Sequence, residues 1–446
     1  MLIDLTVENL FSFKEKVTVP FVATREQQHS SHIVHYSYGK SRQKRFLRTA
    51  VFFGGNASGK SNLIKAIGLA QRMIIFGEGK RQAFKLDANC INKPSEICFH
   101  ILADEKEFEY AFSFTDTEIL KESLVLLRGS KRKRLFVRKF NEGTEFFDEL
   151  DSDSLRMLDR QILTRDQLLL HAVSKTKIIE SQRLLFTIYS WFRDSLRLFS
   201  PDQHFHSYFH GEPYKEFGEM LSCLDTGIDR LDEKEVSFDS FGQLPKSISS
   251  IIEKNENVSI GRSNSPNGAS MPSDYFCVAS EGGEKKLYQV VPMHAGGAGS
   301  AIEFSFEEES DGTRRLFELL PFFISAAKSK RPKVIIIDEA DRCVHPLLIE
   351  KLICDYLDIC CDQSRNQLIL TTHASNLMTQ AIFRRDEIYL VTRTPDGYSV
   401  VDRVSDFDIH KDGDIRKQYL NSMFGGTPFL SGSNLYNLAK NCIWEK

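Results

Sequence analysis

The sequence predicts an α/β fold in which a mixed sheet carries a phosphate-binding loop and a helical insertion interrupts the chain. Three observations lead to this prediction. Residues 50–67 contain an apolar strand, a glycine-rich turn that ends in Gly-Lys-Ser, and a helix with apolar residues at three- and four-residue steps. A second apolar run, at 334–337, ends in Asp338-Glu339, and a third, at 368–370, leads to His373. Continuous apolar runs are typical of strands that are buried on both faces of a sheet.

The turn after the first strand has the composition of a loop that binds phosphate. Backbone N–H groups of such a loop converge on the anion, its lysine reaches the β- and γ-phosphate oxygens, and the next hydroxyl ligates Mg²⁺. We therefore predict that Lys60 contacts phosphate and that Ser61 holds the metal; a glycine turn without a ligand is the less favoured alternative. The predicted nucleotide-binding segment is Gly54, Gly55, Asn56, Ala57, Ser58, Gly59, Lys60, Ser61 and Asn62.

Acidic side chains at the end of the second apolar run predict the catalytic part of the site. Open α/β sheets place their sites at the C-terminal ends of parallel strands, and hydrolysis of a nucleoside triphosphate needs a metal and a group that orients water. We predict that Asp338 belongs to the Mg²⁺ shell and that Glu339 polarises the attacking water. His373 is predicted to sense the γ-phosphate through a hydrogen bond. A helix cap and a structural histidine are the alternatives.

Composition divides the chain into three parts. Residues 1–150 contain the phosphate loop and short strands of an antiparallel flanking sheet, and residues 301–446 contain the two later apolar strands. Residues 151–300 are predicted to be a mainly helical insertion, because glycine is absent from 152–199 and apolar residues recur there at helical spacing. Ser310 is predicted to be the N-cap of an amphipathic helix.

The overall composition excludes some classes of function. A net charge of −3 gives no global reason to expect nucleic-acid binding, so any basic surface is local. The basic runs at 40–45 and 131–134 are either such patches or solvated loops. His204, His206 and His210 are either metal ligands or loop histidines, the latter being favoured. Nine scattered cysteines, no signal-like N-terminus and no long apolar run predict a cytoplasmic protein that does not enter a membrane.

Four stretches of the sequence resemble a known class of proteins. Together they resemble the ATP-binding-cassette class of P-loop ATPases in its soluble SMC-like branch. The likeness is closer to the bacterial AAA-type ATP-binding family related to overcoming-lysogenization-defect proteins, which includes the ATPase subunits of phage-defence systems of the RloA and PARIS AriA type. The stretches are Leu5-Thr6-Val7-Glu8-Asn9-Leu10-Phe11-Ser12-Phe13, residues 54–62, Asp338-Glu339-Ala340-Asp341-Arg342-Cys343-Val344-His345-Pro346, and residues 419–429.

The resemblance implies an ATP hydrolase with Mg²⁺ that dimerises around two ATP molecules. Ser310 and Gly312 of one subunit would contact the γ-phosphate bound by Lys60 of the other. The protein would be the sensor or regulatory subunit of an anti-phage, abortive-infection system that controls a separate effector, for which a Toprim-type nuclease is one candidate. A phage trigger protein, DNA and a higher homo-oligomer are further candidate partners. The alternative is an SMC-like DNA-repair ATPase that acts directly on DNA.

The sequence departs from the family pattern in three respects. The segment from Ser310 to Thr313 lacks the full cassette signature. No glutamine can be assigned to the Q-loop, because Gln71 and Gln82 lie too near the phosphate loop. The 446 residues leave no room for a Toprim nuclease, so we expect any nuclease to be a separate polypeptide.

Overall fold

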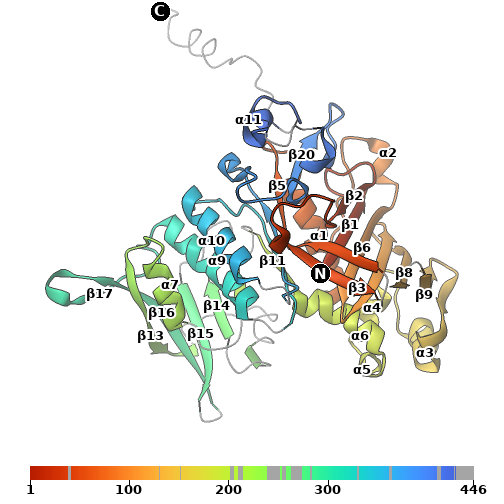
Figure 1. Cartoon of the computed structure of the whole chain (residues 1–446). Coiled ribbons are helices and arrows are strands. Elements are labelled where there is room, and N and C mark those ends of the chain that lie inside the picture. The colour runs from red at the N-terminus through yellow and green to blue at the C-terminus, as the bar shows by residue number, and fades with distance from the viewer. Residues whose placement is uncertain are drawn as a thin grey trace, which may run out of the picture.

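The computed structural model describes residues 1–427, apart from segments that are not considered further. These segments are 39–41, 130, 151, 201–204, 209–213, 239–251, 254–257, 263–273, 282–283, 329–330, 361–363, 409–412 and 426. The predicted α/β fold with a mixed sheet is confirmed: the described chain forms three sheets of five or more strands and a separate two-stranded sheet. Helices pack between and beside the larger sheets (Figure 1). The histidines at 204 and 210 and the loop at 263–273 lie outside the described residues.

A six-stranded sheet, here called the central sheet, carries the phosphate loop. Five of its strands are parallel and the edge strand β21 is antiparallel. In spatial order the strands are β11 (Leu196–Phe199), β18 (Val334–Ile337), β19 (Gln367–Thr371), β5 (Thr49–Phe53), β20 (Ile388–Arg393) and β21 (Ser399–Arg403). β5, β18 and β19 are buried at every position, as their continuous apolar runs predict.

Alternate residues of the central sheet belong to two different hydrophobic cores. Ala50 and Phe52 of β5 pack in a core with α1 (Lys60–Phe76) and the flanking sheet. Val51 and Phe53 pack in a second core with α9 (Asp311–Lys328) and α10 (Pro346–Ile359). The parallel strands are therefore covered on both faces, and their C-terminal ends are where loops gather.

The flanking sheet is seven-stranded and antiparallel, as predicted for the first part of the chain. Its strands alternate between buried and exposed residues because one face packs on the core. In spatial order they are β10 (Gly143–Phe146), β9 (Lys131–Lys139), β8 (Ile119–Arg128), β7 (Lys106–Phe114), β6 (Ser95–Ala103), β1 (Leu2–Glu8) and β2 (Val17–Pro20). The basic run at 40–45 was predicted to be either a basic patch or a solvated loop; in the structure Arg42–Leu47 form β4, which pairs with β3 (Ile33–Tyr38).

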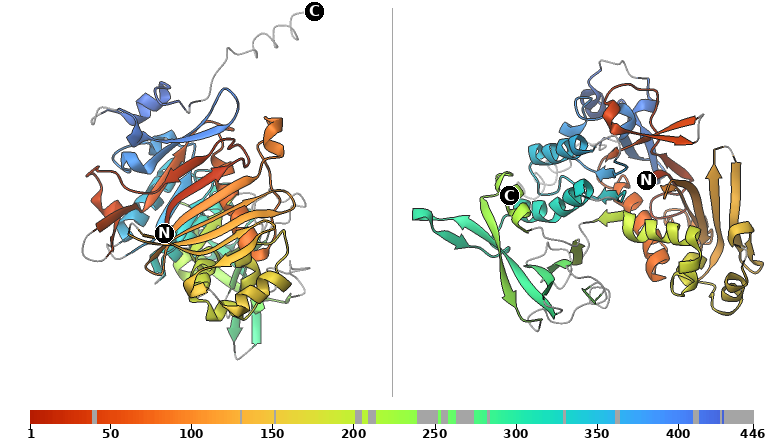
Figure 2. Two further views of the ribbon diagram at one scale, coloured as in Figure 1. Left: turned by 90° about the vertical axis from the view of Figure 1, so that its right-hand side faces the viewer. Right: turned by 60° about the horizontal axis from the view of Figure 1, so that its bottom comes forward.

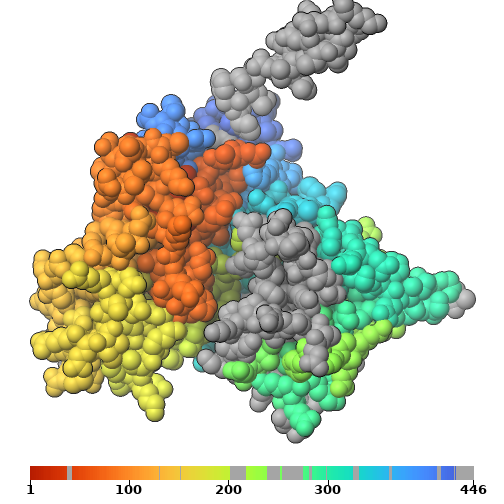
Figure 3. Space-filling model, turned by 180° about the vertical axis from the view of Figure 1, so that it is seen from behind, coloured from red at the N-terminus to blue at the C-terminus, as the bar shows by residue number. Residues whose placement is uncertain are grey.

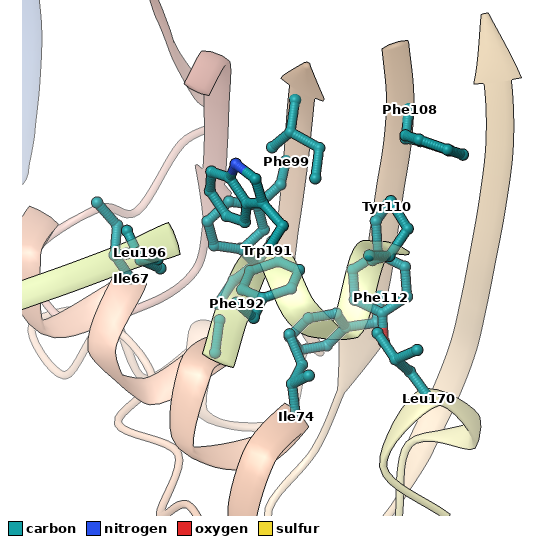
Figure 4. Packing of buried hydrophobic residues seen from close by; sticks show 14 of the residues in the cluster. Ile67, Ile74, Phe99, Phe108, Tyr110, Phe112, Leu170, Trp191, Phe192 and Leu196 are labelled. Carbon is teal, nitrogen blue, oxygen red and sulfur yellow. The ribbon is translucent and has the colours of Figure 1, made fainter. Parts of the chain in front are cut away.

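Helices follow the flanking sheet as predicted, up to residue 195. They are α3 (Asp153–Gln161), α4 (Leu169–Ser174), α5 (Ile178–Ser181), α6 (Arg183–Ser190) and a π-turn at Trp191–Ser195. Trp191 and Phe192 are buried against Phe99, with ring centroids 6.4 and 5.0 Å away (Figure 4). Two further short helices are α2 (Ala88–Ile91), between α1 and β6 in the chain, and α11 (Ile415–Leu420), after β21.

The prediction of a mainly helical insertion over 151–300 is wrong beyond Ser195. There the chain forms β11 and then a third sheet, here called the arm sheet, with only α7 (Tyr214–Ser222) as a helix of more than one turn in the described part. Its spatial order is β12 (Phe205–Tyr208), β14 (Val258–Arg262), β15 (Asp274–Glu281), β16 (Glu284–Ala295) and β13 (Ile228–Val236), with β17 (Ala301–Glu303) also paired to β16. β13 pairs with β16, more than fifty residues later in the chain. Local periodicity in the sequence therefore does not predict this pairing.

The arm sheet and the flanking sheet lie at opposite ends of the molecule. In Figure 1, α9 and α10 separate the arm sheet on the left from the central and flanking sheets on the right, and the second view in Figure 2 agrees. The view from behind in Figure 3 shows the same separation between the orange and yellow residues and the green residues.

Candidate nucleotide site

The phosphate loop connects β5 to α1 and is shaped by close backbone contacts. A Cβ at Gly54 would lie 2.3 Å from the carbonyl oxygen of Val391 in β20, so only glycine fits there. Gly59 has φ +113°, and a Cβ on it would lie 2.1 Å from Ser399 Oγ and 2.7 Å from Ser12 Oγ. The N–H groups of the first turn of α1 follow directly, which is the arrangement that binds anions.

Lys60 is the first residue of α1 and is folded back over the loop. Its Nζ donates to the carbonyl oxygens of Gly54 and Gly55, at 2.8 and 3.2 Å, and the residue is only 5% exposed. Burial lowers the pKa of this ammonium group to about 8, and the carboxylates of Asp338, Asp341 and Glu339 oppose the shift. The ammonium group therefore has carbonyl partners that a phosphate oxygen would replace.

Asp338, at the end of β18, is hydrogen-bonded both to the start of α1, just after the phosphate loop, and to the end of β19. It follows β18, it is buried, and its Oδ1 accepts hydrogen bonds from Ser61 Oγ at 3.2 Å and from Thr371 Oγ1 at 2.5 Å. A hydroxyl and a carboxylate at this distance are oxygen ligands of the kind that Mg²⁺ prefers. Ser61 and Asp338 lie together, as predicted for the metal.

Glu339 occupies a constrained turn immediately after Asp338. Its φ is +50°, a left-handed backbone conformation that is unfavourable for any residue other than glycine. The backbone is held on both sides, because its N–H donates to Thr371 Oγ1 at 2.8 Å and its carbonyl accepts from Arg315 Nη2 at 2.9 Å. The carboxylate is about 39% exposed, so it is accessible to solvent, and it lies 3.7 Å from the guanidinium group of Arg342.

His373 lies next to the same group of side chains, just after β19. Its backbone N–H donates to both carboxylate oxygens of Asp341 at 3.2 Å, which fixes the position of the loop. Burial and the positive charge of Lys60 lower the pKa of His373, against the carboxylates of Asp341, Glu339 and Asp338. A neutral imidazole next to the loop is able to donate one hydrogen bond to a phosphate oxygen.

Ser310 and Gly312 form a separate element at the start of α9. Ser310 is exposed and its Oγ accepts from the backbone N–H of Thr313 at 3.0 Å, so the predicted N-cap is confirmed. A Cβ at Gly312 would lie 2.8 Å from the carbonyl oxygen of Cys343, which explains the glycine. No described hydrogen bond joins these two residues to the phosphate loop of the same chain.

Five residues of the site were not singled out from the sequence. Thr371 connects Asp338 with Glu339, Arg315 donates to the carbonyls of both, and Asp341 holds the backbone of His373. Thr371 ends an otherwise apolar predicted strand and was detectable there, whereas Arg315 lies among other polar and charged residues at the start of its predicted helix, where no signal marks it. Ser12 and Ser399 come from distant parts of the chain, and no local pattern identifies them: Ser399 Oγ donates to the carbonyl oxygen of Ser58 at 2.5 Å and lies 2.8 Å from Ser12 Oγ.

The donor set of this site fits a nucleoside triphosphate with Mg²⁺. The buried Ser58 Oγ has no hydrogen-bond partner among the described residues, and Gly54 and Gly59 let the loop pack closely against Val391 and Ser399. Among those same residues, no group of three or more histidine, cysteine or acidic side chains is arranged to hold a metal by protein ligands alone. A metal here would therefore share its shell with phosphate and water, as Mg²⁺ usually does.

Other candidate residues have structural contacts. Gln71 Nε2 donates to the carbonyls of Phe192 and Leu196, so it is not directed toward the loop. In the basic run, Arg132 pairs with Glu109, and Lys133 pairs with Asp148 and Glu149. Within the described ranges, no helix is long and apolar enough to cross a membrane.

Comparison with known proteins gives one family and several distant structures. The family model described as "AAA domain, putative AbiEii toxin, Type IV TA system" matches residues 50–379. No protein with a curated description matches the chain.

Solved structures of SMC heads align over most of the chain at low identity. A structure titled as the SmcHead bound to the C-winged helix domain of ScpA is 15% identical, covers 90% of this chain and 97% of its own, and has a TM-score of 0.42. The SMC head domain from Thermotoga maritima is 12% identical, with 90% and 98% covered and a TM-score of 0.34. An SMC head with an extended coiled coil, bound to a ScpA domain derived from Pyrococcus furiosus, is 13% identical, with 90% and 96% covered and a TM-score of 0.40.

Proposed function

The chain belongs to the family of AAA domains whose description names a putative AbiEii toxin of a type IV TA system, and on that premise we propose that it hydrolyses ATP with Mg²⁺. The observation that carries the proposal is the 3.2 Å contact between Ser61 of the phosphate loop and Asp338 at the end of β18, with Glu339 next in the chain. The candidate metal ligands, the phosphate-binding lysine and the candidate base thus come together at the C-terminal ends of β5 and β18, which are separated by β19.

Each side chain has a defined part in the proposed reaction. Lys60 leaves the carbonyls of Gly54 and Gly55 and pairs with the β- and γ-phosphate oxygens, which also receive backbone N–H groups of the loop. Ser61 and Asp338 hold Mg²⁺, which neutralises developing charge on the phosphates when bound. Glu339 takes a proton from the attacking water as the water oxygen bonds to the γ-phosphorus, and the bond between the γ-phosphorus and the bridging oxygen breaks, so that ADP leaves. His373 donates to a γ-phosphate oxygen.

We further propose that the site is completed by a second copy of the chain. Ser310 is exposed and caps the 18-residue helix α9; its Oγ accepts from the Thr313 N–H, so the groups offered to an anion outside the chain are the Ser310 hydroxyl and the N–H groups of Asp311 and Gly312. In the proposed dimer, Ser310 and Gly312 of one subunit contact the γ-phosphate bound by Lys60 of the partner. ATP then joins the two chains and hydrolysis releases them.

The proposed biological role is that of a cytoplasmic sensor or regulatory ATPase in an anti-phage, abortive-infection system. The family description, which refers to a toxin of a toxin–antitoxin system, supports a role in controlling a toxic effector. The effector would be a separate protein encoded nearby, a phage protein would be the trigger, and ATP-bound dimers could assemble further. The alternative is direct action on DNA. The ion pairs that Arg132 and Lys133 make with carboxylates weaken this alternative, because these cations already have anionic partners.

Substitution of Glu339 by glutamine tests the proposed hydrolysis. Glu339→Gln should bind ATP as the parent does and lose about 100-fold or more in turnover, because glutamine keeps the shape of the side chain and removes the base. Glu350→Gln, which removes a carboxylate from the exposed side of α10, is the matched control and should keep the parent rate. A Glu339→Gln protein with undiminished hydrolysis would overturn the assignment.

Co-expression with the adjacent open reading frame tests the proposed role. If the protein controls an effector, the neighbouring gene product should co-purify with Glu339→Gln and much less with Lys60→Ala, because only the former is held in the ATP-bound state. Absence of any co-purifying neighbour, together with strong and salt-dependent binding to DNA, would favour the DNA-repair alternative.

A further inference from the structure

The arm sheet leads directly into the segment that carries Ser310. β17 ends at Glu303, and the backbone N–H of the next residue, Phe304, still donates to the carbonyl oxygen of Pro292 in β16 at 2.9 Å. Five residues, 305–309, then separate this pairing from Ser310. Ser305 and Glu308 close that connection into a tight turn, with the Ser305 N–H donating to Glu308 Oε2 at 2.7 Å.

One hydrogen bond ties the last residue of this connection back to the arm. Nε2 of His294, in β16, donates to Oε1 of Glu309 at 2.6 Å, and Glu309 is only 7% exposed. The imidazole is confined from two further directions. The ring of Phe304 lies 4.2 Å from it between centroids, and a Cβ at Gly227 would lie 3.4 Å from its Nδ1. His294 thus holds Glu309, the residue next to Ser310, from a fixed position.

Three aromatic rings join the same arm to the body of α9. Phe306 lies 4.5 Å from Tyr275 of β15 and 4.7 Å from Phe317 of α9, and Tyr275 and Phe317 are 4.3 Å apart between centroids. All three residues are buried. The arm sheet and α9 are therefore one packed unit, and the hydrogen bond from His294 to Glu309 is a largely buried polar contact within that unit.

We propose that His294 and Glu309 are positioning residues that set the place of Ser310. The arm sheet then controls whether residues 310–313, here called the signature segment, can contact a phosphate bound by the partner subunit. This inference rests on the proposed function, since the role of Ser310 in the partner's site belongs to that proposal. Through this contact, a displacement of β16 moves Glu309 and with it Ser310. In Figures 1 and 2 the end of the arm that carries β17 extends away from the rest of the molecule.

Backbone hydrogen exchange in the nucleotide-free chain tests the contact without requiring a dimer. His294→Ala should raise exchange over residues 309–313 about tenfold, because it removes a hydrogen bond to a carboxylate that is almost fully buried. Lys234→Ala is the matched control. Lys234 also lies on the arm and pairs with Glu303 of β17, but on an exposed surface, so exchange over 309–313 should stay at the parent level.

Assembly of the Glu339→Gln chain with Mg-ATP tests the consequence. His294→Ala and Glu309→Ala in that background should each weaken dimerisation about tenfold and leave ATP binding to one chain unchanged. The double substitution should do no more than either alone, because both remove the same hydrogen bond. Glu309→Gln keeps the acceptor oxygen and should assemble like the parent. If His294→Ala does not fold, Glu309→Ala answers the same question from the other partner.

The outcomes separate the two proposals. Parent-like exchange and assembly in both alanine variants would overturn the positioning role, and so would equal losses of dimerisation and single-chain ATP binding, which indicate a merely structural role. Failure of the Glu339→Gln parent itself to dimerise would contradict the proposed function, whereas the exchange result would still decide whether His294 holds the signature segment.

Discussion

The phosphate loop and the signature segment are held by their surroundings in different ways. The loop is contacted from four distant parts of the chain, by Ser12, Asp338, Val391 and Ser399. The signature segment is contacted by Cys343 on one side and by the arm, through His294, on the other. Contacts from many elements over-determine a backbone, whereas a segment with few contacts follows the element to which it is attached.

This difference indicates a division of labour within one chain. The loop side is held together within one chain, because Lys60, Ser61, Asp338 and Glu339 are joined by hydrogen bonds or by adjacency in the sequence. On the signature side, Ser310 caps its own helix and makes no described hydrogen bond to the phosphate loop of the same chain. We therefore expect substitutions on the loop side to affect ATP binding by a single chain, and substitutions on the signature side to affect assembly.

Lys60→Ala should have the largest effect and act on the loop side alone. It removes the only ammonium group known to contact the loop carbonyls in the described structure. ATP affinity should fall at least about 100-fold, on the order of 3 kcal/mol, as expected for loss of a charge-assisted contact with phosphate. Calorimetric titration measures this, with Lys65→Ala on the exposed face of α1 as the control. Retention of parent affinity would mean that this loop is not the phosphate site.

Ser310→Arg should affect the signature side alone. A long cation at the exposed N-cap fills the space that the partner's phosphate would occupy, so dimerisation with Mg-ATP should fall about 100-fold or more while single-chain binding persists. Light scattering and nucleotide titration on the same sample separate the two effects. Normal hydrolysis by Ser310→Arg would show that the signature segment does not act on the partner.

Raising the pH should weaken ATP binding through Lys60. The pKa of Lys60 is lowered to about 8 in the nucleotide-free chain, so the ammonium form that binds phosphate is lost as pH rises through that value. ATP affinity should fall up to about tenfold per pH unit above 8. For folding the sign is opposite: the penalty of burying the charge is full below pH 8 and is relieved between 8 and 10.5, so this group makes the fold more stable with rising pH. Titrations at pH 7, 8 and 9 check the binding effect; Lys60→Ala should show no such dependence.

Ser399→Ala should have the smallest effect of the four and tests whether the contacts from distant strands matter. It removes the hydroxyl that donates to Ser58, at a cost of about 1 kcal/mol, and should lower ATP affinity about fivefold. Ser405→Ala, on an exposed turn after β21, should have no effect. Unchanged affinity in Ser399→Ala would mean that the glycines alone shape the loop.

The sequence allowed prediction of the loop side because its signals are local. A strand, a glycine turn and Lys60-Ser61 are contiguous, and Asp338-Glu339 follows a run of four apolar residues. These patterns depend on neighbours in the chain, and the structure places their side chains together. The fold class followed from the same strands, since their burial on both faces is visible in their composition.

The arm sheet could not be predicted by the same reasoning. β13 and β16 carry mixed polar and apolar residues with one modestly buried face, and their pairing joins residues far apart in the sequence. The helical periodicity up to Ser195 was extended wrongly into this region. Ser12, Ser399 and the contact between His294 and Glu309 escaped detection for the same reason, because only the folded chain brings them together.

The native mass of Glu339→Gln, measured by light scattering with and without Mg-ATP, tests the central claim most directly. The account predicts a particle of 51.1 kDa without nucleotide and about twice that mass with it. The same protein carrying Ser310→Arg should bind ATP and stay at the smaller mass. A Glu339→Gln chain that binds ATP and remains a monomer at every concentration would contradict the claim that ATP joins two copies.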